Sequence, residues 1–199
     1  MSKAVLISIR PKWCEKIASG EKTIEVRKTR PKLQTPFKCY IYCTQASVRY
    51  QTICGCHVLN SDELYRHPEQ GIKHGDSIEL MLCENYTKDN FLNGKVIGEF
   101  ICDRIYELET RSPGGSYYVK GEGQPTTNDV ARQSCLTLKD MHEYLQAGKG
   151  YGWHISNLRI YDHPRELREF TGLRETKFGA EPVPITRPPQ SWRYVEEDT

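Results

Sequence analysis

The chain has 199 residues, of which 28 are lysine or arginine and 26 are aspartate or glutamate, so its formal net charge is only +2. This length suits one domain with insertions and a buried core, while so small a net charge does not by itself indicate a nucleic-acid partner. No stretch approaches the ~20 apolar residues of a membrane span, and the first residues lack the apolar segment of a signal peptide. We therefore expect a soluble, cytoplasmic protein without a membrane partner.

The eight cysteines fit free thiols in an intracellular protein, because nothing in so ordinary a composition indicates a short secreted disulfide framework. Cys39 and Cys43 occupy apolar positions of a predicted strand and are interpreted as buried thiols. Cys54, Cys56 and His57 are close in sequence, but they lack the usual two-residue spacer and no second matching pair follows. We expect neither a metal nor a cofactor, and metal binding by this cluster is the open alternative.

The beginning of the chain predicts a strand, a short helix and a second strand. Residues 4–9 are mostly apolar, and in the helix predicted over 11–19 the side chains of Trp13 and Ile17 lie one turn apart. Gly20 supplies the left-handed residue that commonly ends a helix. The helix is therefore expected to bury one face and to stop before the second strand.

The second strand, predicted over 22–28, alternates apolar and charged residues. Two-residue periodicity places Ile24 and Val26 on one face. Glu25 and Arg27 then share the other face. A half-buried strand needs only polar side chains on its outer face, so charged residues beside a glycine turn favour a functional site over a solvated surface.

Lys22 begins on the face opposite Glu25. It joins the charged pair only if the glycine turn twists the strand start or a bulge intervenes. If the Glu25–Arg27 pair is exposed, it contributes little to stability. If it is partly buried, Arg27 keeps Glu25 ionised and the three side chains form a candidate site. We favour this functional interpretation.

Positive charge is concentrated in the same part of the chain. Between Arg10 and Lys32 there are eight basic and three acidic residues, a local excess of five positive charges. Such a face suits a phosphate-bearing ligand, and a solubilising helix surface is the alternative. Because the basic residues adjoin the ionic strand, we interpret Arg10, Arg27 and Lys28 as ligand-binding residues.

The rest of the chain predicts more strands than helices. Alternating apolar positions predict strands, and helical periodicity predicts helices, over these residues: strands 38–44, 77–83, 95–106 and 153–161, and helices 137–147 and 164–170. Many strands with a few short helices on the rim favour an α+β barrel over a parallel α/β sheet.

Three segments depart from this pattern. Residues 45–75 carry few strand signals and are interpreted as an insertion. Residues 110–133 are rich in Gly, Ser, Thr and Pro, which indicates a mobile flap that closes on a ligand, with plain disorder as the alternative. The Pro-rich tail from Thr171 is expected to pack back onto the barrel through Trp192 and Tyr194.

Aromatic side chains are a second indication of a site that binds bases. Tyr40 lies on the strand face opposite Ile41, and Tyr117 lies in the predicted flap, so both are candidate ligand-binding residues. Trp13 and Trp153 are expected to fill the core or its rim instead.

The motif Gly20-x-Lys22-x-x-Glu25-x-Arg27, preceded by Ser8-Ile9-Arg10-Pro11, resembles the signature of the ASCH domain, a family of the PUA-like superfamily of small β-barrels. The segment 94–100 resembles the central barrel strand of that family, and 151–158 resembles its closing strand. The Pro-Pro-Gln-Ser-Trp segment at 188–192 is similar to the ends of ASCH proteins from phages and prophages.

This resemblance implies an α+β fold, a PUA-like (ASCH) β-barrel with short flanking helices over residues 1–170. From the sequence pattern we place an insertion at about 45–93, a flexible loop at about 110–133 and a Pro-rich tail at 171–199 that packs on the barrel. Three functions are implied: an RNA- or nucleotide-binding module with a basic cleft, a small amidohydrolase or ribonuclease, and a phage protein that sequesters a nucleotide. The partner would be RNA or a nucleoside or nucleotide. The sequence leaves the oligomeric state open, and we favour a monomer.

In the amidohydrolases of the family, which act on N4-acylated cytidine nucleosides, the resemblance assigns Lys22 as the base or nucleophile. The position of Glu25 is a threonine in some of those enzymes and a glutamate in others; on chemical grounds we expect Glu25 to share the acid and base work with Lys22. A further catalytic glutamate of those enzymes precedes the helix matched by 136–145. This chain has no carboxylate in the corresponding segment 132–135, so hydrolysis requires Glu25 or Glu99 in its place. We expect binding in the first place and hydrolysis as the alternative.

Overall fold

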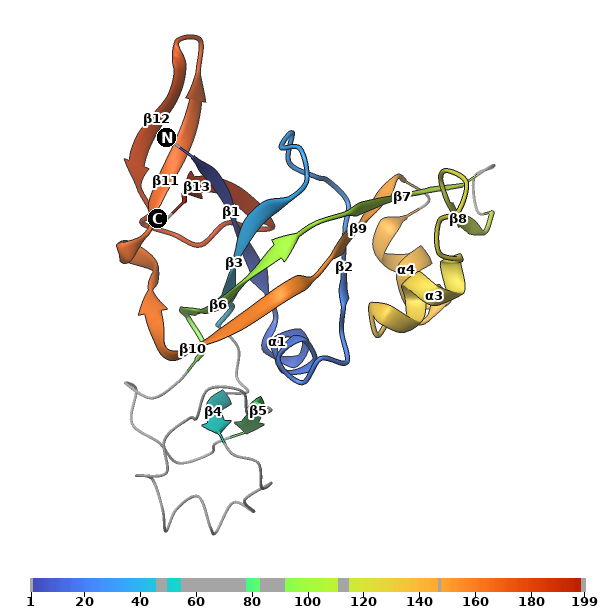
Figure 1. The fold of residues 1–199 in the computed structure, drawn as a ribbon, viewed down its shortest axis with the longest axis horizontal. Coiled ribbons are helices and arrows are strands. Elements are labelled where there is room, and N and C mark those ends of the chain that lie inside the picture. Colours follow the sequence, from blue (N-terminus) through green and yellow to red (C-terminus); the bar gives the residue numbers. More distant parts are fainter. Residues whose placement is uncertain are drawn as a thin grey trace.

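The computed structural model describes residues 2–45, 50–54, 78–82, 92–110, 115–146 and 148–197 (Figure 1). Its helices are α1 (Pro11–Ala18), α3 (Thr127–Gln133) and α4 (Leu138–Leu145), with a short 3-10 turn, η2 (Leu167–Glu169). Its strands are β1 (Lys3–Ile9), β2 (Ile24–Arg27), β3 (Phe37–Cys43), β4 (Tyr50–Cys54), β5 (Ile78–Leu82), β6 (Lys95–Cys102), β7 (Ile105–Thr110), β8 (Tyr117–Val119), β9 (Gly150–His154), β10 (Ser156–Glu166), β11 (Thr171–Thr176), β12 (Gly179–Pro184) and β13 (Trp192–Glu196).

The strands form a seven-stranded sheet in the order β10-β6-β3-β1-β13-β11-β12 and a four-stranded sheet in the order β2-β9-β7-β8. β4 and β5 pair separately. A mostly β chain with three short helices in its described part confirms the predicted α+β class. The described strands do not close either sheet on itself, so the closed barrel stays a prediction.

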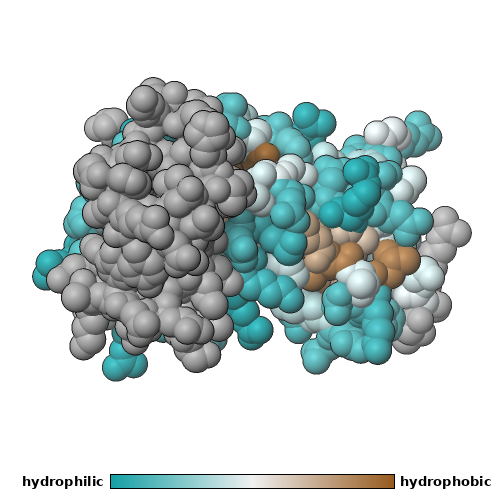
Figure 2. All heavy atoms as spheres, turned by 90° about the horizontal axis from the view of Figure 1, so that it is seen from below, coloured by the Kyte–Doolittle hydropathy of each residue, from teal (hydrophilic) through white to brown (hydrophobic). Residues whose placement is uncertain are grey.

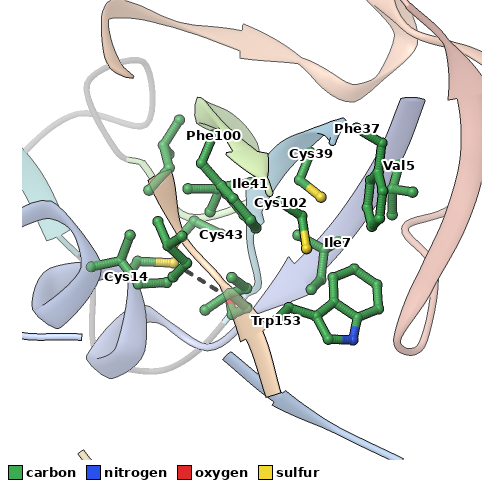
Figure 3. Close-up of a cluster of buried hydrophobic side chains, with 14 of the residues drawn as sticks. Val5, Ile7, Cys14, Phe37, Cys39, Ile41, Cys43, Phe100, Cys102 and Trp153 are labelled. Carbon is green, nitrogen blue, oxygen red and sulfur yellow. Dashed lines mark hydrogen bonds between the residues drawn. The ribbon is translucent and has the colours of Figure 1, made fainter. Parts of the chain in front are cut away.

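The main core lies on one face of the seven-stranded sheet. β1 is nearly all buried because it runs between two neighbours, parallel to β3 and antiparallel to β13. Trp153 of β9 is completely buried in this core, with its ring edge-on to Phe37 at 6.0 Å between centroids. Cys39 and Cys43 belong to the same buried cluster (Figure 3), which confirms their interpretation as buried and free. Burial raises the pKa of Cys39 well above its ordinary value.

Helix α1 forms where the sequence predicts it. Cys14 and Ile17 face the core, and Trp13 packs against it while staying partly exposed. The helix ends at Ala18, and Gly20 follows with a φ of +79°, the left-handed conformation that glycine adopts without strain.

A second cluster joins the four-stranded sheet to α3 and α4. Thr126 and Thr137 each cap a helix through a reciprocal capping box with the aspartate three residues later. Met141 and Leu145 of α4 are buried against the sheet. β8 and α3 lie within the segment 110–133, which the sequence predicted as a loop, and its proposed mobility stays a prediction.

Other predicted elements differ from the observed ones. The strand predicted over 95–106 is two strands, β6 and β7, and the one predicted over 153–161 is β9 followed by β10, which belong to different sheets. The helix predicted over 164–170 is wrong for its first half, because Arg165 and Glu166 pair with β6 in the large sheet. The insertion predicted at about 45–93 lies mostly outside the described residues, as do Cys56 and His57.

No helix in the described ranges combines the length and the apolar character that crossing a membrane requires.

Candidate functional site

Strand β2 is the edge of the four-stranded sheet, and both of its faces are buried. Ile24 and Val26 point into the cluster beneath α3 and α4, as the alternation predicts. Glu25 and Arg27 point the other way and are only 6 % and 8 % exposed. The charged face of this strand is therefore interior rather than solvated.

The structure brings Lys22, Glu25 and Arg27 together. Lys22 Nζ lies 3.1 Å from Glu25 Oε2, and Arg27 Nε lies 2.9 Å from Glu25 Oε1. The Arg27 Nε contact is an ion pair rather than an aligned hydrogen bond. Lys22 precedes the first residue of β2, so strand alternation does not apply to it and it reaches Glu25 without a bulge.

The ammonium group of Lys22 is surrounded by acceptors. Besides Glu25, it donates to the backbone oxygens of Ile24 at 2.9 Å and Ser134 at 2.8 Å. These three contacts account for the three N–H donors of a lysine. The ring of Trp13 lies 5.1 Å from Nζ. Lys22 thus ties the start of β2 to the end of α3, and its side chain is 2 % exposed.

Arg27 connects the four-stranded sheet to the seven-stranded sheet through its side chain, because no described strand of one sheet pairs with a strand of the other. It donates to the backbone oxygen of Ser8 at 2.6 Å and to Ser191 Oγ at 3.4 Å. Ser8 also binds the C-terminal segment, because its N–H donates to Ser191 O at 2.9 Å and its hydroxyl to Pro189 O at 2.6 Å. The Pro-Pro-Gln-Ser-Trp segment therefore forms one wall of the buried network.

The charges of the network determine the state of Glu25. Burial on its own raises the pKa of Glu25, but the charges of Lys22 and Arg27 and their contacts with the carboxyl outweigh burial and hold this pKa below its ordinary value. Glu25 is accordingly a carboxylate at neutral pH, and the three side chains together carry a net positive charge.

Basic and aromatic side chains surround the network at the surface. Tyr144 of α4 is 40 % exposed. Burial raises the pKa of Tyr144 above its ordinary value, although the charges of Arg27 and Arg10 act to lower it. Lys28 Nζ lies 5.4 Å from the Tyr144 ring. We call the following set the basic surface: Arg10, Lys12, Lys28 and Arg30, with the rings of Trp13, Tyr144 and Tyr151, each within 6.0 Å of one of these cations.

Two predicted ligand-binding residues lie elsewhere. Tyr40 is completely buried on the other face of β3, with its ring 5.0 Å from that of Phe170. Tyr117 borders a cavity of about 590 Å³ between β8, α3 and α4, and its hydroxyl donates to Gly148 O at 2.9 Å. Figure 2 shows an apolar area on the surface over α3 and α4, where Leu138 is 50 % exposed.

Of the two carboxylates that could serve hydrolysis, Glu25 lies beside Lys22, whereas Glu99 has another partner. Glu99 accepts a hydrogen bond from the Tyr161 hydroxyl of β10 at 2.7 Å. In the segment 132–135, the group that meets Lys22 is the backbone oxygen of Ser134. Among the residues that the structure describes, no three His, Cys, Asp or Glu side chains are grouped so that they could hold a metal ion.

Sequence reasoning missed Ser8, Ser134 and Ser191. Each contacts the network, two of them through a backbone oxygen, which the amino-acid type does not reveal. The sequence signals were the Ser8-Ile9-Arg10-Pro11 segment, which contains Ser8, and the Pro-Pro-Gln-Ser-Trp segment, which contains Ser191.

The chain is similar to solved structures of ASCH from Zymomonas mobilis. For the protein itself the TM-score is 0.46 at 15 % identity, covering 98 % of this chain and 88 % of that one. Two variants of the same protein, one with tyrosine replaced by phenylalanine and one with serine replaced by alanine, give TM-scores of 0.46 and 0.45, each at 15 % identity and 98 % coverage of this chain, with 92 % and 89 % of theirs. These are structures of the family that the Gly20–Arg27 motif resembles. The chain matches no protein-family model and no curated protein.

Proposed function

We propose that this chain is an ASCH (PUA-like) domain protein that binds RNA or a nucleotide through the basic surface. The observation that carries the proposal is Lys28, an exposed cation that directly follows Arg27 and whose Nζ lies 5.4 Å from the partly exposed ring of Tyr144; Arg10, directly after β1, is a second exposed cation. Cations recognise phosphate and aromatic rings stack on bases, so this combination suits a nucleotide unit.

The buried network has a positioning role in this proposal. Lys22, Glu25 and Arg27 hold the end of β2 against β1 and against the turn after α3. Because Lys28 follows Arg27 directly and Arg10 follows the end of β1, a fixed network fixes the distance between the two exposed cations. Prepared geometry of this kind lowers the entropic cost of binding.

Hydrolysis by Lys22 and Glu25 is the alternative, favoured by their contact of 3.1 Å. A general base must present a lone pair to its substrate within hydrogen-bond reach. Lys22 instead donates to Ile24, Ser134 and Glu25 and is 2 % exposed, so turnover would require this arrangement to open. Binding without turnover, including nucleotide sequestration, agrees better with the geometry.

Salt-dependent binding tests the proposal. We expect the affinity for a labelled single-stranded RNA to fall with salt, with a log–log slope of about −0.7 for each phosphate contact. Arg10→Ala and Lys28→Ala should each weaken binding and remove about one such contact. Lys139→Ala, an exposed lysine of α4 that pairs with Glu143, is the matched control and should change little. Equal effects of all three substitutions would contradict a site at the basic surface.

A turnover assay separates the two candidate functions. Wild-type protein is incubated with N4-acetylcytidine and the absorbance of released cytidine is followed. We expect nucleoside binding without release. Release that disappears in Lys22→Met, in a variant that still folds, would instead establish the hydrolase.

A further inference from the structure

The hairpin of β11 and β12 carries an exposed aromatic side chain at its tip. The two strands pair along their whole length, so the turn contains only Lys177 and Phe178. Phe178 is 98 % exposed, whereas the next most exposed large apolar side chains of the described residues, Leu138 and Tyr144, are 50 % and 40 % exposed. In Figure 1 the hairpin projects from one end of the seven-stranded sheet, away from α3 and α4.

The tip is held by its own hydrogen bonds. The Thr176 hydroxyl donates to Gly179 O at 2.8 Å and accepts from the N–H of Phe178 at 3.2 Å. Gly179 has a φ of +122°, which glycine adopts without strain and other residues rarely do. The turn therefore presents Phe178 in a prepared position, which lowers the entropic cost of a contact.

The charges of the hairpin leave one cation at the tip. Arg174 pairs with Glu181 at 2.8 Å, and Glu175 pairs with Lys3 of β1 at 2.6 Å. Lys177 has no ion pair with any residue that the structure describes. The tip thus offers a partner one ring and one ammonium group.

The outer edge of the hairpin is unsuited to strand pairing. β12 is the last strand of the seven-stranded sheet, and it contains Pro182 and Pro184. Proline has no N–H to donate to a further strand and is common on protected edges. The tip, rather than the edge, is therefore the part of the hairpin that is available to a partner.

The hairpin tip is small, and its size indicates which class of partner it can bind. A specific protein interface buries about 1,200–2,000 Å² in total, and an amphipathic membrane anchor inserts several apolar side chains. Each nucleotide of an unpaired nucleic-acid strand offers one flat base and one phosphate, which one ring and one cation match. We propose that Phe178 stacks on an unpaired base of a single-stranded nucleic acid while Lys177 contacts an adjoining phosphate.

The inference takes the class of ligand, RNA or a nucleotide, from the proposed function. It restricts that class to a strand of several nucleotides. In Figure 1 the hairpin tip and α1, which carries part of the basic surface, are well separated. A mononucleotide therefore reaches only one of them, and a strand of several nucleotides is needed to engage both. The ligand is accordingly a single-stranded chain rather than a free nucleotide.

Fluorescence anisotropy with a labelled single-stranded RNA of about sixteen nucleotides and with a labelled mononucleotide tests this inference. Phe178→Ala should weaken RNA binding by about fivefold to 150-fold, the range expected for one stacked base. It should leave mononucleotide binding unchanged. Phe178→Trp should keep the RNA affinity, whereas Phe178→Leu, which is apolar but not aromatic, should lose it. Leu138→Ala is the matched control for removal of an exposed apolar side chain and should change neither affinity.

The experiment also has outcomes that would overturn the proposal. Unchanged RNA affinity in Phe178→Ala, or wild-type affinity in Phe178→Leu, overturns the stacking contact while mononucleotide binding leaves the proposed function intact. Loss of binding to phosphatidylserine vesicles in Phe178→Ala, with RNA binding unaffected, assigns the tip to a membrane surface instead. Failure of the wild type to bind either ligand rejects both proposals.

Discussion

The β2 network and the β11–β12 hairpin both contain short ion pairs, but in opposite surroundings. In the hairpin the pairs are 2.6 and 2.8 Å long, and their side chains are 33–67 % exposed. In the network the contacts are 2.9 and 3.1 Å long, and the side chains are 2–9 % exposed. The shorter contacts are therefore the ones in water.

The comparison shows that solvent, more than distance, decides what an ion pair does for the protein. Water screens the hairpin pairs, and exposed pairs of this kind contribute about 0–1 kcal/mol. In the network, each charge has been removed from water and depends on its partners, so loss of one partner leaves a buried charge uncompensated. The exposed hairpin pairs therefore contribute little to stability, whereas the buried network fixes β2 in place.

The largest expected effect is that of Glu25→Gln. It removes the only negative charge between Lys22 and Arg27, and should lower the free energy of unfolding by about 3–5 kcal/mol. Urea denaturation followed by circular dichroism measures the loss. Glu181→Gln is the matched control in the hairpin, and equal losses in the two variants would refute the difference between buried and exposed pairs.

The next largest expected effect is the coupling between Lys22 and Glu25 in the free energy of unfolding, which a double-mutant cycle measures. Lys22→Met leaves two backbone oxygens without their donor, yet in combination with Glu25→Gln it should cost less than the sum of the single losses. We expect a coupling energy of about 1–3 kcal/mol from the unfolding free energies. The corresponding cycle of Lys3→Met with Glu175→Gln should be additive within about 0.5 kcal/mol. Additivity in the buried pair would mean that the two charges do not act together.

Acid should abolish part of the contribution of Glu25. Its pKa is lower in the folded state than in the unfolded chain, so the unfolded state takes up a proton first as the pH falls. The stability that this carboxylate provides is complete above the unfolded pKa of about 4.3 and is lost as the pH falls through the folded value. The stability difference between wild type and Glu25→Gln should therefore shrink below about pH 4. A constant difference at all pH values would exclude a depressed pKa.

The smallest effect is expected in the hairpin. Glu181→Gln should change the unfolding free energy by less than about 1 kcal/mol, and added salt should reduce even this change. Thermal melts at low and high ionic strength measure it. A loss that persists in high salt would show that Arg174 and Glu181 are shielded from water after all.

The features that the sequence predicted correctly depend on residues that are close together in the chain. Helix α1 and its glycine end follow from residues within one turn of each other, and the alternation of β2 correctly separated Ile24 and Val26 from Glu25 and Arg27. The motif also brought Lys22 into the candidate site. These features needed no knowledge of the rest of the chain.

What the sequence did not predict depended on distant partners. Alternation placed Tyr40 opposite the core, but only the packing of Phe170, more than a hundred residues later, shows that this face is covered as well. Lys22 meets Ser134 through a backbone oxygen, which any amino acid at that position would supply. The capping box of helix α3, Thr126 with Asp129, is present in the sequence. The helix was not predicted because the glycines and prolines around it indicated a loop.

The pairing of β1 with β13 has a consequence for synthesis of the protein. Lys3 lies opposite Glu196, so β13, which completes the middle of the large sheet, leaves the ribosome long after its neighbour β1. Chains emerge at about 5–20 residues per second, and during that interval β1 has an unpaired, mostly apolar edge that other strands can join. Arg27 also lacks Ser191 until then. We expect nascent chains to need protection against aggregation until the last strand has docked.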